Sequence, residues 1–287
     1  MHSVEDDTPE RELPTLLTAA TRSLAAGGVP SPRVDAELLA AYVLSVPRSR
    51  LRLVGSLTPA QATLFASLVA RRAAREPLQH VTGEAPFYGL SLAVGPGVFV
   101  PRFETELLVE WALRQPASRV VDLCSGSGAI AVAFAVNRPS ARVTAVERSP
   151  AALRWLRRNV DALAPSVEVV EGDVTDFSIL SDVDGSVDLV LCNPPYVPLD
   201  APVDVEVRDH DPAEAVFAGD DGLALMPAVA ARAAALLRPG GRLAIEHDDT
   251  QGESLPALLR EGPFTDVTDH ADLAGRPRFT TARRVAD

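Results

Sequence analysis

The alternation of short apolar strands with helices from residue 119 onward most constrains how this chain can fold. Arg119 to Leu123 and Arg142 to Glu147 are apolar runs of strand length, and residues 129–137 and 150–163 carry helical patterns after them. A strand, a crossover helix and a second parallel strand form one βαβ unit. Successive units of this kind build a doubly wound, mostly parallel sheet. We therefore expect an α/β, Rossmann-like fold.

The rest of this segment extends the same pattern. Further strands are expected at residues 167–170, 187–191, 242–246, 264–269 and 278–284, with helices near 223–237 and 252–260. Only a short loop with Gly and Pro separates the last two strands, so they should pair antiparallel at one edge of the sheet.

The residues before this sheet predict two smaller parts. Helices are expected at residues 13–26, 32–46 and 59–75, where Ser31 and Thr58 each precede a proline as an N-cap residue would. Beyond them, β-type runs at 90–94 and 98–100 within a segment rich in Gly and Pro predict a hairpin. The expected organisation is a helical domain at 1–78, a hairpin linker at 79–103 and a catalytic domain at 104–287.

The charged residues exclude some classes of function. All 27 basic residues are arginine, so neither a P-loop nor a Schiff-base or pyridoxal enzyme is possible, because both need a lysine. The net charge of −12 argues against a stable nucleic acid partner. Residues 13–75 hold eight Arg against only Asp35 and Glu37. These helices are predicted to be a basic docking module, with ordinary solvated helix faces as the alternative.

The sequence also bears on where the protein acts and on whether it holds a metal. The best apolar run, 129–136, is far shorter than the about 18 residues that cross a membrane. The first dozen residues are acidic, unlike a secretory signal, so we expect a cytoplasmic protein. Two cysteines and five scattered histidines show no zinc-site spacing, and no metal site is expected.

A loop of small residues between the first strand and its helix predicts a nucleotide-type site. The helix start supplies free N–H donors, and Glu147, at the end of the second strand, can accept both hydroxyls of a ribose. The loop also satisfies G-x-G-x-x-A, so a nicotinamide dinucleotide, S-adenosylmethionine and an empty tight turn all remain open. Asp173 is either an acceptor for an adenine amino group or a solvated carboxylate. The predicted cofactor-binding residues are Cys124, Ser125, Gly126, Ser127, Gly128, Glu147, Asp173, Val174 and Asn193.

The fourth strand runs directly into Asn193-Pro194-Pro195-Tyr196. Two prolines stiffen this turn and remove N–H donors, which leaves carbonyl oxygens exposed beside an amide and an aromatic ring. The ends of the first and fourth strands flank the point where the strand order reverses, the usual ligand crevice. The turn should therefore face the glycine loop, although a rigid loop without function is the alternative.

This group of residues suits a planar –NH₂ acceptor. The side-chain oxygen of Asn193 and the carbonyl of Pro194 can accept its two N–H bonds, while the ring of Tyr196 packs beside it. An amide nitrogen is a weak nucleophile, so the acceleration must come from orienting it toward a sulfonium methyl group. The predicted catalytic residues are Asn193, Pro194 and Tyr196.

With these motifs, the chain resembles the bacterial protein-(glutamine-N5) methyltransferases that modify class 1 peptide chain release factors. The resemblance implies S-adenosylmethionine as cofactor, the glutamine of a Gly-Gly-Gln loop as methyl acceptor and an N-terminal helical domain that helps to bind the release factor. It also implies that Phe99 packs beside the acceptor, with a place in the hairpin core as the alternative. The expected substrate-binding residues are Phe99, Asn193, Pro194, Pro195 and Tyr196. The matching segments are 83–89, 98–106, 122–131, 193–196, 211–223, 238–241 and 246–247.

The chain departs from the family pattern at several positions. Cys124 replaces a glycine, which predicts that the backbone there has no positive φ. Glu147 replaces an aspartate, Phe103 a proline and Asp211 a glutamate. The resemblance gives a bridging, structural role to Arg102, Glu104 and Glu106, while Glu246-His247 is interpreted as a strand end and not as a source of a catalytic base.

Three alternatives stay open at this point: glutamine methylation of ribosomal protein L3, adenine N6-methylation of nucleic acid, and a non-catalytic scaffold. Cys124 and Cys192 should face one crevice, where they are either inert core thiols or a pair able to form a disulfide.

Overall fold

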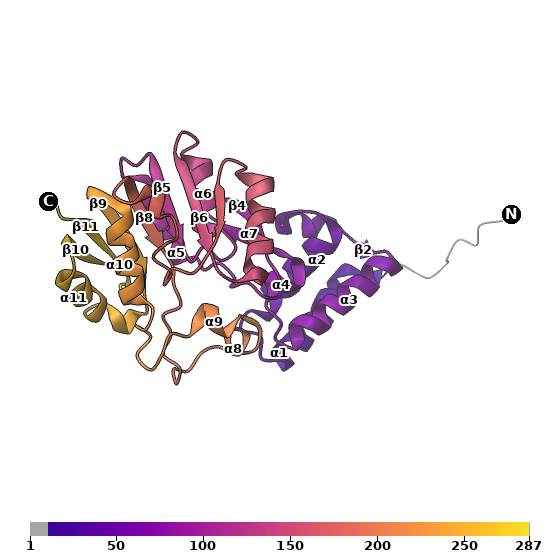
Figure 1. Cartoon of the computed structure of the whole chain (residues 1–287). Coiled ribbons are helices and arrows are strands. Elements are labelled where there is room, and N and C mark those ends of the chain that lie inside the picture. The colour runs from indigo at the N-terminus through magenta and orange to yellow at the C-terminus, as the bar shows by residue number, and fades with distance from the viewer. Residues whose placement is uncertain (1–10, 287) are drawn as a thin grey trace. The chain divides into compact units, whose positions relative to one another are not determined.

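A computed structural model describes residues 11–286 and divides the chain into two compact units, 1–83 and 84–287 (Figure 1). The acidic residues 1–10, on which most of the argument against a secretory signal rested, lie outside the described part. Within residues 11–286, no helix is long and apolar enough to span a bilayer. The boundaries expected at residues 78 and 103 stay a prediction.

The first unit is built from helices around an apolar core. These are α1 (Leu13–Ala26), α2 (Pro32–Leu44), α3 (Pro59–Ala73) and the short α4 (Leu78–Thr82), with a 3₁₀ turn at Arg48–Leu53. Two short strands, β1 (Arg11–Glu12) and β2 (Ser56–Leu57), pair antiparallel. Buried leucines from α1 and α2 pack against Phe65 of α3. The three long helices predicted from the sequence are therefore confirmed.

The ends of these helices show which capping signals were correct. Thr58 Oγ1 accepts a hydrogen bond from Gln61 N at 3.3 Å, and Gln61 Oε1 accepts one from Thr58 N at 3.0 Å, so α3 begins with a capping box. Ser31 makes no such side-chain bond at α2. Helix α2 ends two residues earlier than predicted because Ser45 adopts a left-handed φ of 53°.

The second unit opens with a hairpin that differs from the predicted one. Its strands are β3 (Glu84–Phe87) and β4 (Leu90–Ala93), joined through Tyr88 and Gly89 at φ of 48° and 77°. Two successive positive φ values are the signature of a tight hairpin turn. The second predicted strand, 98–100, is wrong: Val98 and Val100 are buried in an irregular segment.

A seven-stranded sheet forms the centre of this unit, in the order β10-β11-β9-β8-β5-β6-β7. Strands β5 to β9 run parallel, and β11 pairs antiparallel with both β9 and β10. The predicted doubly wound sheet and its antiparallel last pair are confirmed. The strands are β5 (Arg119–Leu123), β6 (Arg142–Glu147), β7 (Glu168–Glu171), β8 (Val187–Cys192), β9 (Leu237–Glu246), β10 (Phe264–Ala271) and β11 (Pro277–Arg284).

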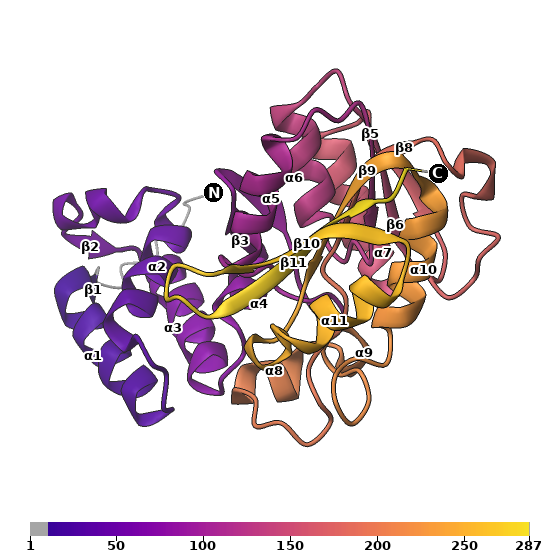
Figure 2. The same ribbon diagram turned by 90° about the vertical axis from the view of Figure 1, so that its left-hand side faces the viewer.

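Helices cover both faces of this sheet (Figure 2). One face packs against α5 (Thr105–Leu113), α6 (Ala129–Asn137) and α7 (Pro150–Leu163). The other packs against α10 (Met226–Leu236) and α11 (Ser254–Glu261). Helix α5 and the short α8 (Val205–His210) and α9 (Ala213–Val216) were not predicted. Short 3₁₀ turns lie at Ser181–Val183 and Asp249–Gln251.

The core of the first unit contains an ion pair whose loss should be costly. Arg72 Nε lies 2.7 Å from Asp35 Oδ2, and the two side chains are 5% and 11% exposed. Asp35→Ala removes the carboxylate from a buried guanidinium and should lower the free energy of unfolding of this unit by about 3 kcal/mol. Hydrogen exchange of amides in α1 to α3 measures this directly.

Glu37→Ala is the matched control. Glu37 pairs with the half-exposed Arg33 and Arg48, and loss of such surface pairs should cost less than about 1 kcal/mol. Equal effects of the two substitutions would contradict the stabilising role of the buried pair.

Candidate active site

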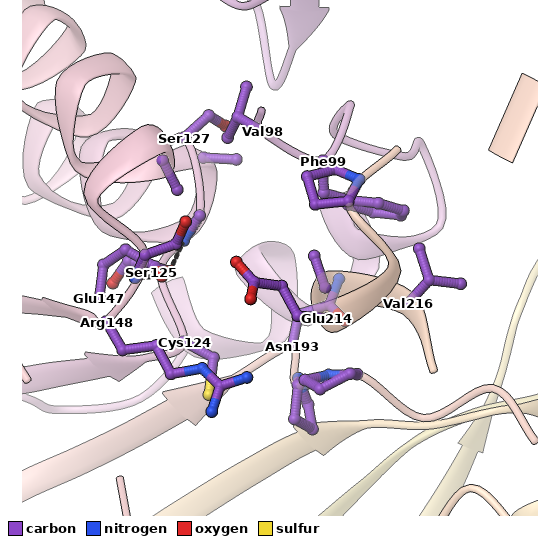
Figure 3. A pocket seen from close by; sticks show the side chains of 18 of the residues that line it. Val98, Phe99, Cys124, Ser125, Ser127, Glu147, Arg148, Asn193, Glu214 and Val216 are labelled. Carbon is purple, nitrogen blue, oxygen red and sulfur yellow. Dashed lines mark hydrogen bonds between the residues drawn. The ribbon is translucent and has the colours of Figure 1, made fainter. Parts of the chain in front are cut away.

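A cavity of about 310 Å³ opens at the carboxyl ends of β5 and β8 (Figure 3). The two strands are parallel neighbours with Leu123 opposite Cys192, so the loops that follow them leave the sheet side by side. The strand order reverses between them, as expected for a ligand crevice in an open α/β sheet. The glycine loop and the Asn193 turn both line this cavity.

In the glycine loop, residues 124–128, every second residue has a left-handed, positive φ. Cys124, Gly126 and Gly128 have φ of 60°, 58° and 85°. The prediction that Cys124 avoids a positive φ is therefore wrong: this cysteine occupies a conformation that favours glycine. Gly128 cannot be replaced easily, because a Cβ there would lie 2.5 Å from Leu156 Cδ1.

Glu147 ties the glycine loop to the start of α7. Its Oε2 accepts a hydrogen bond from Gly126 N at 2.8 Å, and its Oε1 accepts one from Ser149 N at 2.7 Å. Ser149, the residue before α7, is thus held through its backbone, and its side chain makes no capping hydrogen bond. Each carboxylate oxygen of Glu147 keeps a lone pair for another donor, and the residue lines the cavity.

Asp173, after β7, is also part of the cavity wall. Its Oδ1 accepts hydrogen bonds from Thr175 N at 2.9 Å and Thr175 Oγ1 at 2.8 Å, and Arg148 Nη1 lies 3.2 Å from its Oδ2. These donors, the Thr175 backbone first, lower the pKa of the Asp173 carboxyl below its ordinary value. The side chain is therefore an ionised, oriented acceptor beside Val174.

Asp122 is a buried acid to which sequence reasoning gave no role. It lies in the middle of the sheet on β5, and its Oδ2 accepts a hydrogen bond from Ala131 N, in the first turn of α6, at 3.2 Å. Burial raises the pKa of this carboxyl to about 7, although hydrogen bonds from Ser125 and Ala131 oppose the shift. The sequence feature that could have identified Asp122 is a carboxylate among the apolar residues of a buried strand.

The Asn193 turn is fixed by hydrogen bonds from three directions. Asn193 Nδ2 donates to Thr105 Oγ1 at 3.1 Å, and Tyr196 Oη donates to Glu246 Oε1 at 3.0 Å. Gln251 Nε2 donates to the Tyr196 carbonyl at 3.0 Å. Asn193, Pro194, Pro195 and Tyr196 all line the same cavity as the glycine loop. The geometry therefore places an amide, two prolines and an aromatic ring opposite a nucleotide-type loop.

Known proteins share this arrangement in sequence. Residues 15–83 match the family model of the PrmC N-terminal domain, and residues 91–206 match that of the methyltransferase small domain. A release factor glutamine methyltransferase of Mycolicibacterium smegmatis is 54% identical over 96% of this chain and 98% of its own length. One from Streptomyces coelicolor is 49% identical over 93% of this chain and 96% of its own.

The chain belongs to the release factor glutamine methyltransferase family. Among solved structures, the catalytic domain of hMettl16 aligns with a TM-score of 0.54 and 16% identity, covering 80% of this chain and 83% of its own. At that identity the likeness shows only a shared fold.

On the side of the cavity opposite the glycine loop, Phe99 lines the wall (Figure 3). The guanidinium carbon of Arg102 lies 4.8 Å from the centre of the Phe99 ring, and Arg102 Nη2 lies 2.7 Å from Asp211 Oδ2. Glu106 Oε1 accepts a hydrogen bond from Tyr88 N at 2.8 Å. Arg102 and Glu106 therefore bridge segments, as the resemblance implied, and the bridging role of Glu104 stays a prediction.

Some residues of the wall were missed by sequence reasoning. Arg148 follows β6, while Glu214 and Val216 belong to α9 (Figure 3). Helix α9 reaches the cavity because residues 216–218 pair with Val197: Val197 N donates to Val216 O and Ala218 N to Val197 O, both at 2.9 Å. Nothing in the sequence around 197–218 indicates this pairing.

His247 lies in the core and not at the cavity. His247 is fully buried, with Nε2 2.9 Å from Asp269 Oδ1 and Nδ1 2.8 Å from the carbonyl of Asp248. It does not belong to the cavity wall. Within the described chain, no cluster of three or more His, Cys, Asp or Glu side chains is placed to hold a metal ion.

Cys124 and Cys192 are both free thiols, and they lie in contact. Burial, followed by a hydrogen bond with Cys124, raises the pKa of the fully buried Cys192 thiol well above its ordinary value. Cys124 is only partly buried and lines the cavity. Disulfide formation by this pair stays a prediction.

Treatment with hydrogen peroxide tests whether Cys124 and Cys192 form a disulfide. Attack of the Cys124 thiolate on peroxide gives a sulfenic acid and water, and attack by Cys192 then forms the disulfide and a second water. We expect a cross-linked peptide pair in a non-reducing digest. The variant Cys192→Ala should instead keep a sulfenic acid on Cys124 that dimedone traps. Over-oxidation of Cys124 without any cross-link in the wild-type protein would show two independent thiols.

Proposed function

We propose that this chain transfers a methyl group from S-adenosylmethionine to the side-chain amide nitrogen (N5) of the glutamine in the Gly-Gly-Gln motif of class 1 peptide chain release factors. The observation that carries this proposal is the Asn193 turn, which lines one cavity together with the glycine loop. The names of the relatives support the same acceptor. We propose further that it acts in the cytoplasm, with no stable nucleic acid or membrane partner.

The residues of the cavity fit S-adenosylmethionine. A volume of about 310 Å³ lies within the usual ~300–1,000 Å³ of small-molecule pockets. A Cβ at Gly126 would meet no atom within 4 Å, so the loop leaves open space above it. Glu147 has the spare lone pairs for two ribose hydroxyls, and Asp173 with Val174 would hold the adenine. When bound, S-adenosylmethionine supplies the methyl group from its sulfonium sulfur.

The residues of the chain then have to orient the acceptor. Asn193 Oδ1 and the Pro194 carbonyl accept the two N–H bonds of the glutamine amide and so fix its plane. Tyr196 and Phe99 pack beside that plane and exclude water. Accepting both N–H bonds increases the electron density on the nitrogen, while fixed orientation supplies much of the acceleration. No strong base is needed before attack, because the proton leaves afterwards.

The N-terminal unit is assigned to substrate docking. Residues 13–75 carry eight arginines and two acids, so this part of the chain is basic. The whole chain has a net charge of −12. Complementary charge speeds association and selects partners. We therefore propose 1–78 as the docking domain, 79–103 as a linker and 104–287 as the catalytic domain.

The direct test offers the enzyme a choice of acceptors. Purified release factors, ribosomes and duplex DNA are incubated with methyl-labelled S-adenosylmethionine, and the label is located by mass spectrometry. We expect it on the glutamine of the release-factor Gly-Gly-Gln motif. Label on ribosomal protein L3 or on adenine instead would assign one of the two alternative activities.

Asn193→Ala tests the amide acceptor. The variant loses one of two oriented acceptors, so kcat should fall about 100-fold or more, while cofactor affinity should change much less. Asn137→Ala is the control, because Asn137 Nδ2 donates to Ala133 O within α6, away from the cavity. Retained turnover in the Asn193 variant would contradict the proposed chemistry.

Glu147→Gln tests the ribose acceptor. In this variant an NH₂ group replaces one carboxylate oxygen. The NH₂ group cannot accept a hydrogen bond, so it faces either a backbone N–H or a ribose hydroxyl as donor against donor. We expect the Kd for S-adenosylmethionine, measured by calorimetry, to rise about 10-fold or more. Glu168→Gln, on the exposed start of β7, should leave it unchanged. Equal affinity in both variants would remove Glu147 from the cofactor site.

A further inference from the structure

A buried asparagine on α7 contacts two separate segments of the cavity wall. Asn159 is 2% exposed and does not itself line the cavity. It is hydrogen-bonded to Ser127 of the glycine loop and to Ala93, the last residue of β4. The residues that follow β4, 94–99, are called here the Phe99 segment. Both the glycine loop and the Phe99 segment line the cavity (Figure 3).

Three hydrogen bonds fix the Asn159 amide in one orientation. Its Oδ1 accepts from Ala93 N at 2.7 Å, and its Nδ2 donates to Ala93 O at 2.9 Å and to Ser127 O at 2.9 Å. A backbone N–H only donates and a carbonyl only accepts, so the two ends of the amide cannot be exchanged. Both N–H bonds of Asn159 are therefore used to hold backbone carbonyls, one in each segment.

The same face of α7 supports the Phe99 segment further along. Trp155, four residues before Asn159, donates from Nε1 to Pro96 O at 3.3 Å. Ala151, another four residues earlier, lies so close that a Cβ at Gly97 would be 2.8 Å from its own Cβ. Residues four apart share one face of a helix. Helix α7 thus sets the place of the Phe99 segment, and Asn159 extends this contact to the glycine loop.

We propose that Asn159 is a positioning residue that sets the separation between the glycine loop and the Phe99 segment. This inference rests on the proposed function, in which the loop holds S-adenosylmethionine and Phe99 packs beside the acceptor glutamine. Methyl transfer needs the acceptor nitrogen in line with the sulfonium methyl group, so this separation matters for turnover. Asn159 acts only through the backbone of Ser127 and Ala93, and its loss should affect both sides of the cavity.

Asn159→Asp tests the two N–H donors. The ionised side chain keeps an acceptor for Ala93 N but turns its second oxygen against two carbonyls, as acceptor against acceptor. At about pH 9 we expect the Kd for S-adenosylmethionine, measured by calorimetry without acceptor, to be about 10-fold higher than in the wild type. At saturating cofactor, kcat/KM for the release factor should be lower by roughly 10- to 100-fold.

Lower pH should rescue this variant. Burial raises the pKa of a carboxyl, so the introduced side chain gains a proton as the pH falls, and its O–H can again donate to one of the two carbonyls. At about pH 6 both constants should return to within about 3-fold of the wild type. Asn159→Leu has nearly the shape of asparagine but no donor at any pH, so it should stay impaired throughout.

The control makes the same chemical change elsewhere. Asn137→Asp alters an exposed residue of α6 whose Nδ2 donates to Ala133 O, away from the cavity, and should change neither constant. Asp122 on β5, Glu147 on β6 and Arg158 on α7 are the charged groups around these segments. They are present in every variant, so each constant is expressed as a ratio to the wild type at the same pH.

The two constants separate the possible failures. Wild-type values in Asn159→Leu, or an equal loss in Asn159→Asp and Asn159→Leu at every pH, would overturn the proposal. A higher Kd with unchanged kcat/KM would confine Asn159 to the glycine loop and contradict its link to the Phe99 segment. If the wild-type enzyme binds S-adenosylmethionine but methylates no release factor, the proposed function fails, while the Kd ratios still test the contact with the glycine loop.

Discussion

The parallel pairing of β5 with β8 is the constraint on which the rest of the second unit depends. Because Leu123 of β5 pairs with Cys192 of β8, the glycine loop and the Asn193 turn leave the sheet at neighbouring positions on the same edge. Helices on both faces bury this pair completely, so its register cannot slip without exposing apolar side chains. The glycine loop and the Asn193 turn, about 70 residues apart in sequence, thereby line one cavity.

Three buried acids on the parallel strands β5, β6 and β9 hold the segments around that cavity. Asp122 on β5 reaches the first turn of α6, Glu147 at the end of β6 holds the glycine loop, and Glu246 at the end of β9 holds Tyr196. Burying a carboxylate is costly unless donors surround it. In each case the donors come from a loop or a helix start, so the acid fixes the segment that has to stay in place.

The sequence predicted those parts of the molecule that local patterns determine. The bounds of β5, α6, β6 and α7 follow directly from apolar periodicity and capping residues. The position of the Asn193 turn followed from the order of strands alone. Local patterns do not report pairing between distant segments. Thr105 and Asn193 meet across 88 positions, and α9 reaches the cavity through its pairing with Val197.

Backbone conformation was a second source of error. Cys124 adopts the positive φ that a glycine would prefer, because Ser125 N is held by Val146 O at 2.9 Å and Gly126 N by Glu147. Tyr88 also has a positive φ, in the hairpin turn. The hairpin therefore lies at residues 84–93, closer to the N-terminus than the predicted strands at 90–94 and 98–100. Tertiary hydrogen bonds and turn geometry override residue preference at such sites.

A structure of the enzyme with S-adenosylhomocysteine and a glutamine-containing release-factor peptide tests the central claim most directly. The account predicts the glutamine amide nitrogen about 3 Å from both Asn193 Oδ1 and the Pro194 carbonyl oxygen, with Asn193 Nδ2 still on Thr105. A glutamine held by other groups, with the Asn193 amide turned away from it, would contradict the account.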